Sequence, residues 1–230
     1  MKKIEELGDL NKKKVLLRLD LNVPLNSGEI TDTTRIDKIL PTLKFLIQKK
    51  SKIIIISHIG RPNGKSDKKL SMLPVCKYLS KKLNQDVNLI EEKIFDINPR
   101  KIFKNNNKIV FLENIRFYKE EENNNEKFAK LLSNFGDIFI NDAFSCSHRA
   151  HASVENITKF IPSYCGIQMD TELNALKKVT SDIEKPIMCI IGGSKISSKI
   201  KIIKNLIPKF ENIAIVGGMA NNILKYKGFN

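Results

Sequence analysis

Apolar and polar residues follow one repeated arrangement along the chain: an apolar run of strand length, a polar or glycine-bearing turn, and a segment of helical periodicity. This alternation of strands and helices predicts an α/β fold with a mainly parallel sheet and helices on both faces. Strands are expected at 52–56, 87–90, 109–112, 137–140, 186–191 and 213–216. Helices are expected at 32–50, from Ser71 to Leu83, around 128–132, at 169–182, around 200–206, and from 218 to near 228.

The stretch 15–24 alternates strictly between apolar and polar residues from Leu17 to Val23, and Pro24 ends it. Its polar positions are Arg18, Asp20 and Asn22. Alone, the pattern fits a sheet edge with its polar face in water, or the carboxyl end of a strand where open α/β sheets bind small ligands. Both interpretations remain open for this stretch taken by itself.

Polar groups also follow directly on three other predicted strands, and these decide between the two interpretations. They are His58 with Arg61, Arg116, and the group Asn141, Asp142 and Arg149. Because the carboxyl ends of parallel strands share one edge of a sheet, we expect these side chains and those of Asp20 and Asn22 to converge on a ligand.

The formal net charge of +15 raises the possibility of nucleic-acid binding. However, only six of the 40 basic residues are arginine, and the lysines are spread over every predicted helix, which is typical of a solvated surface. Each arginine is therefore informative. Five of them lie on the opening strand or in or near the turns that follow strands: Arg18, Arg35, Arg61, Arg116 and Arg149. They predict a small ligand with more than one negative charge.

Several other classes of protein are not favoured by the sequence. No apolar run approaches the length of a membrane span, and the first residues include acids and lack an apolar signal core. The four cysteines are widely spaced, which predicts reduced thiols in a cytoplasmic protein. No cysteine or third histidine completes a metal-binding set with His148 and His151, so we expect no metal site. We also expect no covalent nucleophile and no membrane partner.

Five motifs occur in the order in which they occur in phosphoglycerate kinases, and the chain resembles that family along its whole length. They are Arg-Leu-Asp-Leu-Asn-Val-Pro at 18–24, Ser-His-Ile-Gly-Arg-Pro at 57–62, Leu-Glu-Asn-Ile-Arg-Phe at 112–117, Asn-Asp-Ala-Phe followed by His-Arg-Ala-His-Ala-Ser within 141–153, and Gly-Gly-Ser-Lys at 192–195.

The resemblance implies two Rossmann-like α/β domains joined by a long helix. We expect a phosphoglycerate-binding, three-layer domain at 1–168, an interdomain helix at 169–185, and the beginning of a nucleotide-binding domain at 186–230. The implied reaction is the reversible transfer of a phosphoryl group from 1,3-bisphosphoglycerate to ADP, giving 3-phosphoglycerate and ATP in glycolysis. The implied Mg²⁺ is carried by the nucleotide, and we expect a monomer.

The resemblance also assigns roles to individual residues. Arg35, Lys195 and Lys199 would act on the transferring group, the two lysines from the nucleotide side. The substrate would be held by Asp20, Leu21, Asn22, Arg35, His58, Ile59, Gly60, Arg61, Arg116 and Arg149. The nucleotide would contact Gly193, Lys195, Lys199, Gly217 and Gly218, although a bare Gly-Gly turn fits tight packing equally well.

The chain departs from the family pattern in three respects. Ser145 stands where glycine is common, and Val216 stands where a third glycine often precedes Gly217 and Gly218. The second domain is also much shorter than in the family, so we expect an amino-terminal fragment with a substrate-side anion site and little or no turnover of its own. The alternatives are a non-catalytic anion-binding module and, less favoured, a basic nucleic-acid-binding domain.

Overall fold

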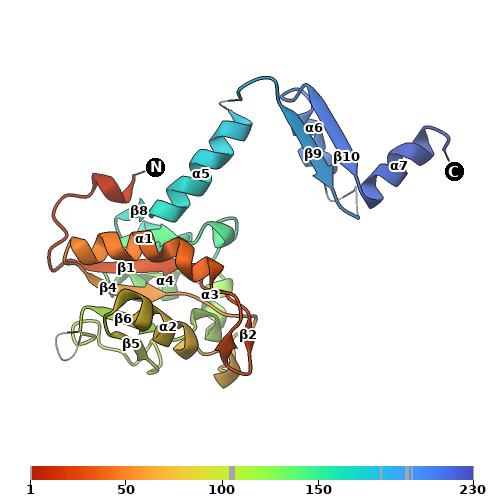
Figure 1. Ribbon diagram of the computed structural model, residues 1–230. Coiled ribbons are helices and arrows are strands. Elements are labelled where there is room, and N and C mark those ends of the chain that lie inside the picture. The colour runs from red at the N-terminus through yellow and green to blue at the C-terminus, as the bar shows by residue number, and fades with distance from the viewer. Residues whose placement is uncertain (1, 104–106, 182, 195–196, 198, 230) are drawn as a thin grey trace. The chain divides into compact units, whose positions relative to one another are not determined.

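The computed structural model describes residues 2–103, 107–181, 183–194, 197 and 199–229. It divides into a first unit, Met1–Glu172, and a second unit, Leu173–Asn230, and each has its own sheet (Figure 1). Among the described residues no helix is long and apolar enough to cross a membrane.

The first unit is built on a six-stranded, all-parallel sheet in the order β5-β6-β4-β1-β7-β8. Its strands are β1 (Lys14–Leu19), β4 (Lys52–Ile56), β5 (Val87–Ile90), β6 (Ile109–Leu112), β7 (Ile138–Asp142) and β8 (Ser163–Cys165). A small antiparallel hairpin, β2 (Leu25–Asn26) with β3 (Glu29–Ile30), lies outside this sheet. The parallel α/β architecture predicted from the sequence is confirmed.

Helices cover both faces of the sheet and make the unit three-layered (Figure 1). They are α1 (Thr34–Gln48), α2 (Leu73–Leu83), α3 (Lys119–Glu122) and α4 (Glu126–Ser133). A further helix, α5 (Ile167–Thr180), follows β8 and continues into the second unit. Short 3-10 helices occur at η1 (Ile4–Glu6), η2 (Lys68–Leu70), η3 (Ile115–Phe117), η4 (Phe144–Cys146) and η5 (Asn156–Lys159).

Two apolar clusters lie on opposite sides of the sheet, and the local sequence explains how the helices reach them. Apolar residues of α1 at helical spacing, including Ile36 and Leu43, pack in the cluster on one side. Phe128 and Leu132 of α4 pack in the cluster on the other side. The Asn125 side chain accepts a hydrogen bond from the backbone N–H of Phe128 and so begins α4.

The opening strand differs from its prediction. β1 ends at Leu19 and lies in the middle of the sheet, between β4 and β7. The interpretation of this stretch as a water-exposed sheet edge is therefore wrong. The alternation up to Val23 continues through a loop, because the two sides of that loop differ: Leu21 and Val23 are buried in the core, while Asp20 and Asn22 face a cleft. Arg18, on the predicted polar face, is completely buried.

The second unit contains a two-stranded parallel sheet of β9 (Met188–Gly192) and β10 (Asn212–Val216). α6 (Ile200–Leu206) follows β9, and α7 (Gly218–Tyr226) follows β10. Its small core is formed by Ile191, Ile203 and Met219.

Candidate functional site

Polar residues that follow β1, β4, β6 and β7 line one cleft of about 280 Å³ in the first unit. The cleft is lined by Asp20, Asn22, Arg35, His58, Gly60, Arg61, Arg116, Ser145, Cys146 and Arg149. Eight of the ten residues predicted to hold the substrate are therefore brought together. The convergence follows from the parallel sheet, since all four strands end at the same edge.

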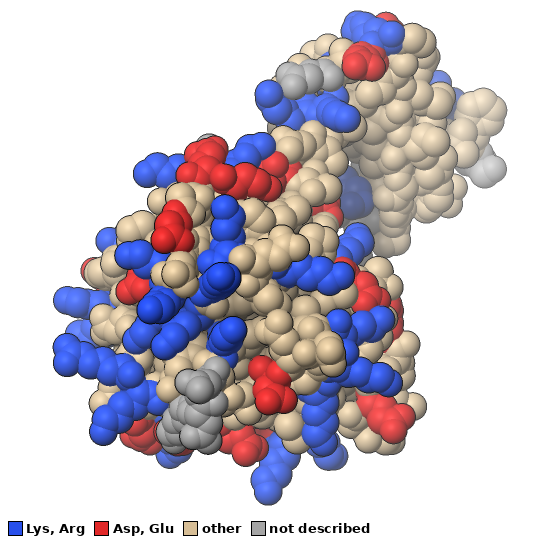
Figure 2. Space-filling model, turned by 60° about the vertical axis from the view of Figure 1, so that its left-hand side comes forward, with Lys and Arg blue, Asp and Glu red and all other residues tan. Residues whose placement is uncertain are grey.

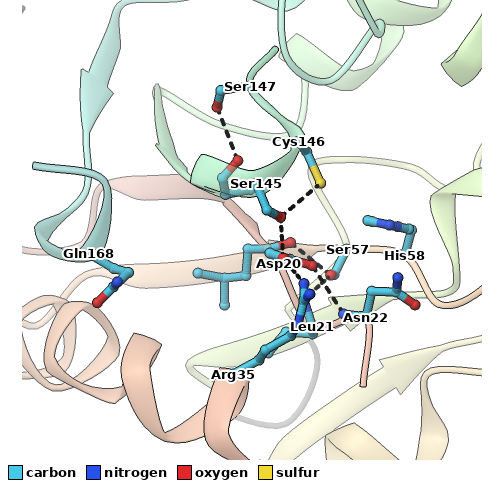
Figure 3. A network of polar contacts seen from close by, with 12 residues as sticks. Asp20, Leu21, Asn22, Arg35, Ser57, His58, Ser145, Cys146, Ser147 and Gln168 are labelled. Carbon is cyan, nitrogen blue, oxygen red and sulfur yellow. Dashed lines mark hydrogen bonds and ion pairs between the residues drawn. The ribbon is translucent and has the colours of Figure 1, made fainter. Parts of the chain in front are cut away.

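Asp20 lines this cleft and is held between two partners (Figure 3). Arg35 Nη1, from the first turn of α1, donates to Asp20 Oδ2, and Ser145 Oγ donates to the same oxygen. The Arg35 side chain is about half exposed (49%), whereas that of Asp20 is only 13% exposed. Arg35 is therefore anchored at its tip and still open to a ligand.

The turn after β4 depends on Gly60. Its φ of +66° is in the left-handed region, and a Cβ on it would lie 2.8 Å from Leu70 Cδ2. The Gly60 N–H donates to Asn22 Oδ1 at 2.9 Å, and the Gly60 carbonyl accepts from Arg116 Nη1 at 3.0 Å. One glycine thus orients two of the predicted substrate residues.

Leu21 and Ile59, the other two predicted substrate residues, have buried side chains in the apolar core and do not line the cleft. Ser57 Oγ accepts a hydrogen bond from the Leu21 N–H at 3.0 Å and donates to the carbonyl of Leu19 at 2.7 Å. The Ile59 carbonyl accepts from Asn114 Nδ2 at 2.8 Å. These two residues fix the cleft's loops through their backbone.

The arginines of the cleft differ in how firmly they are held. Arg116 is 3% exposed, and its Nε lies 3.5 Å from Glu122 Oε1. Burial lowers the pKa of its guanidinium, although Glu122 opposes this. Arg61 is exposed and Arg149 is half-buried. The buried arginine provides a fixed charge, and the other two can adjust to a ligand.

His58 is 3% exposed and lies at the end of β4 beside the cleft. Its Nδ1 is 3.1 Å from Arg18 Nη2. Burial, together with the positive charges of Arg18 and Arg116, lowers the pKa of His58 to about 2. The ring is therefore neutral at physiological pH.

Asp20, His58 and Cys146 each place one potential ligand atom within 4.8 Å of the others, a geometry that a metal ion could use. The surrounding charge opposes a cation, because Arg35 already pairs with Asp20 and Arg18 already contacts His58. Four arginines line the same cleft. The arrangement suits an anion.

Asn141 and Asp142 lie at the end of β7 but do not line this cleft. Asp142 is 1% exposed; its carboxylate accepts from Thr42 Oγ1 at 2.6 Å and from the Met169 N–H at 2.8 Å. It therefore fastens the first turn of α5 to α1. Its role is structural, contrary to the expectation that all the polar groups after the strands face a ligand.

In the second unit, four residues predicted to contact a nucleotide lie together. A Cβ on Gly193 would lie 3.2 Å from Cε of Lys199, and a Cβ on Gly218 would lie 3.6 Å from the carbonyl oxygen of Gly193. Gly217 has a φ of +66° and precedes α7. Lys199 immediately precedes α6. Lys195 lies outside the described residues.

Known proteins resemble this chain in sequence and in fold. Residues 4–230 match the family model described as phosphoglycerate kinase. The chain belongs to the phosphoglycerate kinase family.

Similar members include the phosphoglycerate kinases of Wolbachia pipientis wMel and Borrelia turicatae (strain 91E135). The first is 47% identical, over 96% of this chain and 56% of the relative; the second is 45% identical, over 96% and 57%. The solved structure of phosphoglycerate kinase from Coxiella burnetii has a TM-score of 0.90 at 37% identity, covering 99% of this chain and 57% of the other. That from Pyrococcus horikoshii OT3 has a TM-score of 0.85 at 29% identity. The chain thus spans a little over half the length of these relatives.

Some residues at or behind the site received no role from the sequence. Ser145, a departure from the phosphoglycerate kinase pattern, donates a hydrogen bond to Asp20 and lines the cleft. Cys146 is buried and lines the cleft as well, beside Asp20 and His58, and nothing in the sequence pointed to it. Ser153 and Glu121 lie behind the cleft and are completely buried. Glu121 stands in a run of three glutamates, where nothing distinguishes it.

Proposed function

We propose that the first unit holds phosphoglycerate and that the whole protein carrying this chain is a phosphoglycerate kinase. The observation that carries the proposal is the cleft of about 280 Å³ lined by four arginines and a neutral histidine, with Asp20 and Asn22 at one side. A phosphate oxygen accepts hydrogen bonds from guanidinium and imidazole N–H groups, and a glycerate hydroxyl can donate to a carboxylate. Both kinds of partner are present.

In this proposal His58, Arg61, Arg116 and Arg149 hold the distal phosphate. Asp20 and Asn22 bind the hydroxyl and carboxyl region of the glycerate. Arg35, which is anchored by Asp20 and about half exposed, supplies positive charge to the transferring phosphoryl group. Phosphoryl transfer depends mainly on positioning and on charge stabilisation of the equatorial oxygens, so no covalent nucleophile is required.

The second unit would contribute to the nucleotide side. The turns at Gly193, Gly217 and Gly218 carry no side chain, and Lys199 lies beside Gly193, which suits the approach of phosphates to the backbone. We assign Lys199 and Lys195 to the transferring group from this side. Mg²⁺ bound to ATP or ADP would neutralise phosphate charge there. The ammonium group of Lys199 and the backbone N–H groups of these glycines are the kinds of donor that would fit a phosphate chain.

The proposed reaction is the reversible transfer of a phosphoryl group from 1,3-bisphosphoglycerate to ADP, giving 3-phosphoglycerate and ATP, as a step of glycolysis. The enzyme would be monomeric and would act in the cytoplasm. The 230-residue chain alone is expected to bind 3-phosphoglycerate with little or no turnover. A coupled assay for ATP formation tests this, and normal turnover by the chain alone would contradict it.

Isothermal titration calorimetry with 3-phosphoglycerate tests the substrate assignment. The chain should bind it, and Arg149→Ala should weaken binding roughly 10- to 100-fold through the loss of a charge-assisted contact. Lys204→Ala, an exposed lysine of α6, is the matched control and should bind as the parent chain does. Absence of binding by the parent chain would overturn the assignment. Binding by the whole protein without turnover would favour a non-catalytic anion-binding module.

The nucleic-acid alternative is tested by titrating duplex DNA at several salt concentrations. On the face shown in Figure 2, Lys and Arg side chains form separate groups with acidic and uncharged residues between them. Nucleic-acid binding would show a steep salt dependence that survives Arg35→Ala and Arg149→Ala. We expect no such binding.

A further inference from the structure

Four buried polar residues from four segments form one connected chain behind the cleft. Glu121 of α3, Ser153, Arg18 of β1 and His58 after β4 are exposed by 0%, 0%, 0% and 3%. A completely buried guanidinium and a completely buried carboxylate are costly unless they compensate each other. Here they are joined through Ser153. The chain ends at His58, which contacts Arg18 and lines the cleft.

The hydrogen atoms of this chain can be assigned from its donors and acceptors. Ser153 donates its hydroxyl to Glu121 Oε1 at 2.6 Å and its N–H to Glu121 Oε2 at 2.9 Å. Because that hydroxyl proton is committed to the carboxylate, Ser153 Oγ accepts from Arg18 Nε, which lies 3.0 Å away. The serine therefore fixes the orientation of the guanidinium plane.

The orientation of Arg18 then determines the state of His58. A guanidinium has only donors, so His58 Nδ1, 3.1 Å from Arg18 Nη2, must be the acceptor. In a neutral imidazole that accepts at Nδ1, the proton is on Nε2. Among the described residues, none receives a hydrogen bond from His58 Nε2, which leaves this N–H for a ligand in the cleft.

The charges around His58 keep the ring neutral. Besides Arg18, the residues that lower its pKa are Arg116, Arg149 and His151, and burial has the largest effect. Asp20 and Cys146 also face the ring, with ligand atoms within 4.8 Å. Arg35 and Ser145 engage the Asp20 carboxylate and so weaken its pull on a second proton.

We infer that Arg18, oriented by Glu121 through Ser153, is a positioning residue that fixes His58 as the Nε2–H tautomer and so presents one neutral donor to an anion in the cleft. This inference rests on the proposed function only for the identity of the anion. A fixed Nε2–H favours ligands whose oxygens are bare acceptors at this position, as in a phosphate, and disfavours ligands that present an N–H or O–H there.

Nuclear magnetic resonance of the full chain, with ¹⁵N in its histidine rings, tests the tautomer directly. The chain has three histidines, so His58→Gln identifies the signal. We expect His58 to be neutral, with its proton on Nε2, throughout pH 6 to 8. A signal of the Nδ1–H tautomer or of the doubly protonated ring would overturn the inference.

Two variants test the role of the buried chain. Arg18→Met combined with Glu121→Gln removes both buried charges together, so that neither is left uncompensated. Ser153→Ala removes only the hydroxyl that links Glu121 to Arg18. It is the milder change and serves as the test if the double variant does not fold. Both should give a mixture of the two tautomers. Ser51→Ala is the matched control: its hydroxyl is also buried and donates to a backbone carbonyl, that of Leu46. A pure Nε2–H tautomer in every variant would overturn the role of Arg18.

Binding distinguishes this inference from the proposed function. In the double variant, affinity for 3-phosphoglycerate should fall on the order of tenfold, because one hydrogen bond to a charged oxygen is partly lost. If the parent chain shows the Nε2–H tautomer but binds no 3-phosphoglycerate, the proposed function fails and the positioning role stands. If it binds 3-phosphoglycerate with the other tautomer, the positioning role fails and the proposed function stands.

Discussion

β4 in the first unit and β9 in the second have the same kind of sequence, an apolar run with little interruption, but they have different surroundings. From Ile53 to Ile56, β4 is completely buried between β1 and β6. Among the described residues β9 pairs with β10 alone, and its Met188 and Ile190 are 60% and 68% exposed. An apolar run therefore predicts a strand, whereas its burial depends on what the rest of the fold places on each face.

The two groups of candidate site residues differ in the same way. In the first unit, Asp20, Asn22 and Arg116 are each held by other residues of the cleft. In the second, Gly193, Gly217 and Gly218 have no side chains, and the described residues of this unit form a core of three buried side chains. The proposed substrate site is thus largely preorganised, whereas the proposed nucleotide side consists mainly of turns.

The largest expected effect separates the contributions of the two units to the reaction. In the whole protein, Arg35→Ala and Lys199→Ala should each reduce turnover roughly 10³-fold, because each would remove a charge that, in the proposed function, stabilises the transferring group. Only Arg35→Ala should also weaken 3-phosphoglycerate binding, measured by calorimetry. Equal loss of that binding in both variants would contradict the division between the units.

A matched pair of isoleucines tests the difference between the strands. Ile54→Ala in β4 should lower the free energy of unfolding by about 2–5 kcal/mol through a buried cavity. Ile190→Ala in β9 should lower it by less than about 1 kcal/mol, since that side chain is 68% exposed. Urea unfolding followed by far-ultraviolet circular dichroism measures both. Similar costs would mean that β9 is covered in solution.

The pH dependence of stability tests the burial of His58. Its folded pKa is lowered to about 2, below the unfolded value, so the unfolded chain binds the proton first as the pH falls. The contribution of neutral His58 to the free energy of unfolding is therefore fully present above about pH 6.5. Below that pH the contribution falls by about 1.4 kcal/mol per pH unit.

His58→Gln should remove this loss, measured by urea unfolding at pH 6.5, 5.5 and 4.5. Glu121 and Asp142, whose pKa values are raised by burial, act in the opposite direction in both proteins and cancel in the difference. His148→Gln, at an exposed position, is the control. A difference between parent and His58→Gln that does not change with pH would contradict the prediction.

The smallest expected effect concerns the residue that departs from the family pattern. Ser145→Gly removes the hydroxyl that donates to Asp20, while Arg35 still holds the same oxygen. We expect a loss of about 1 kcal/mol in 3-phosphoglycerate binding, measured by calorimetry, consistent with one hydrogen bond. Ser147→Ala, at a neighbouring exposed serine, is the control. Unchanged or tighter binding by Ser145→Gly would show that Asp20 needs only Arg35.

Where both faces of a strand are apolar, the sequence located it well. The bounds of β4 and β6 agree with the prediction, because a buried parallel strand has a continuous apolar run that ends where polar residues begin. The bounds of β5 agree as well, although β5 is a half-buried edge strand that contains Asn88. The predicted end of β1 was wrong, since the alternation to Val23 reflects a loop with one side in the core and the other at the cleft. β8 and the β2–β3 hairpin were missed because they are short and weakly patterned.

Most cleft residues could be predicted because each follows a strand, and a parallel sheet brings such positions to one edge. Glu121 and Ser153 could not. Their partner Arg18 is more than 100 residues away in the sequence, and a charged residue is expected at the surface unless a buried partner is known. Burial of a charge is a property of the assembled fold, and no local pattern shows it.

The strand order of the first unit has a consequence for synthesis on the ribosome. β1 is made first, but one of its two neighbours, β7, begins only at Ile138. At typical translation rates of about 5–20 residues per second, the stretch between them takes roughly 6–24 seconds to emerge. During that time one edge of β1 has no partner, and its apolar side chains are available to chaperones. The nascent chain is therefore expected to be most prone to aggregation before residue 142 leaves the exit tunnel.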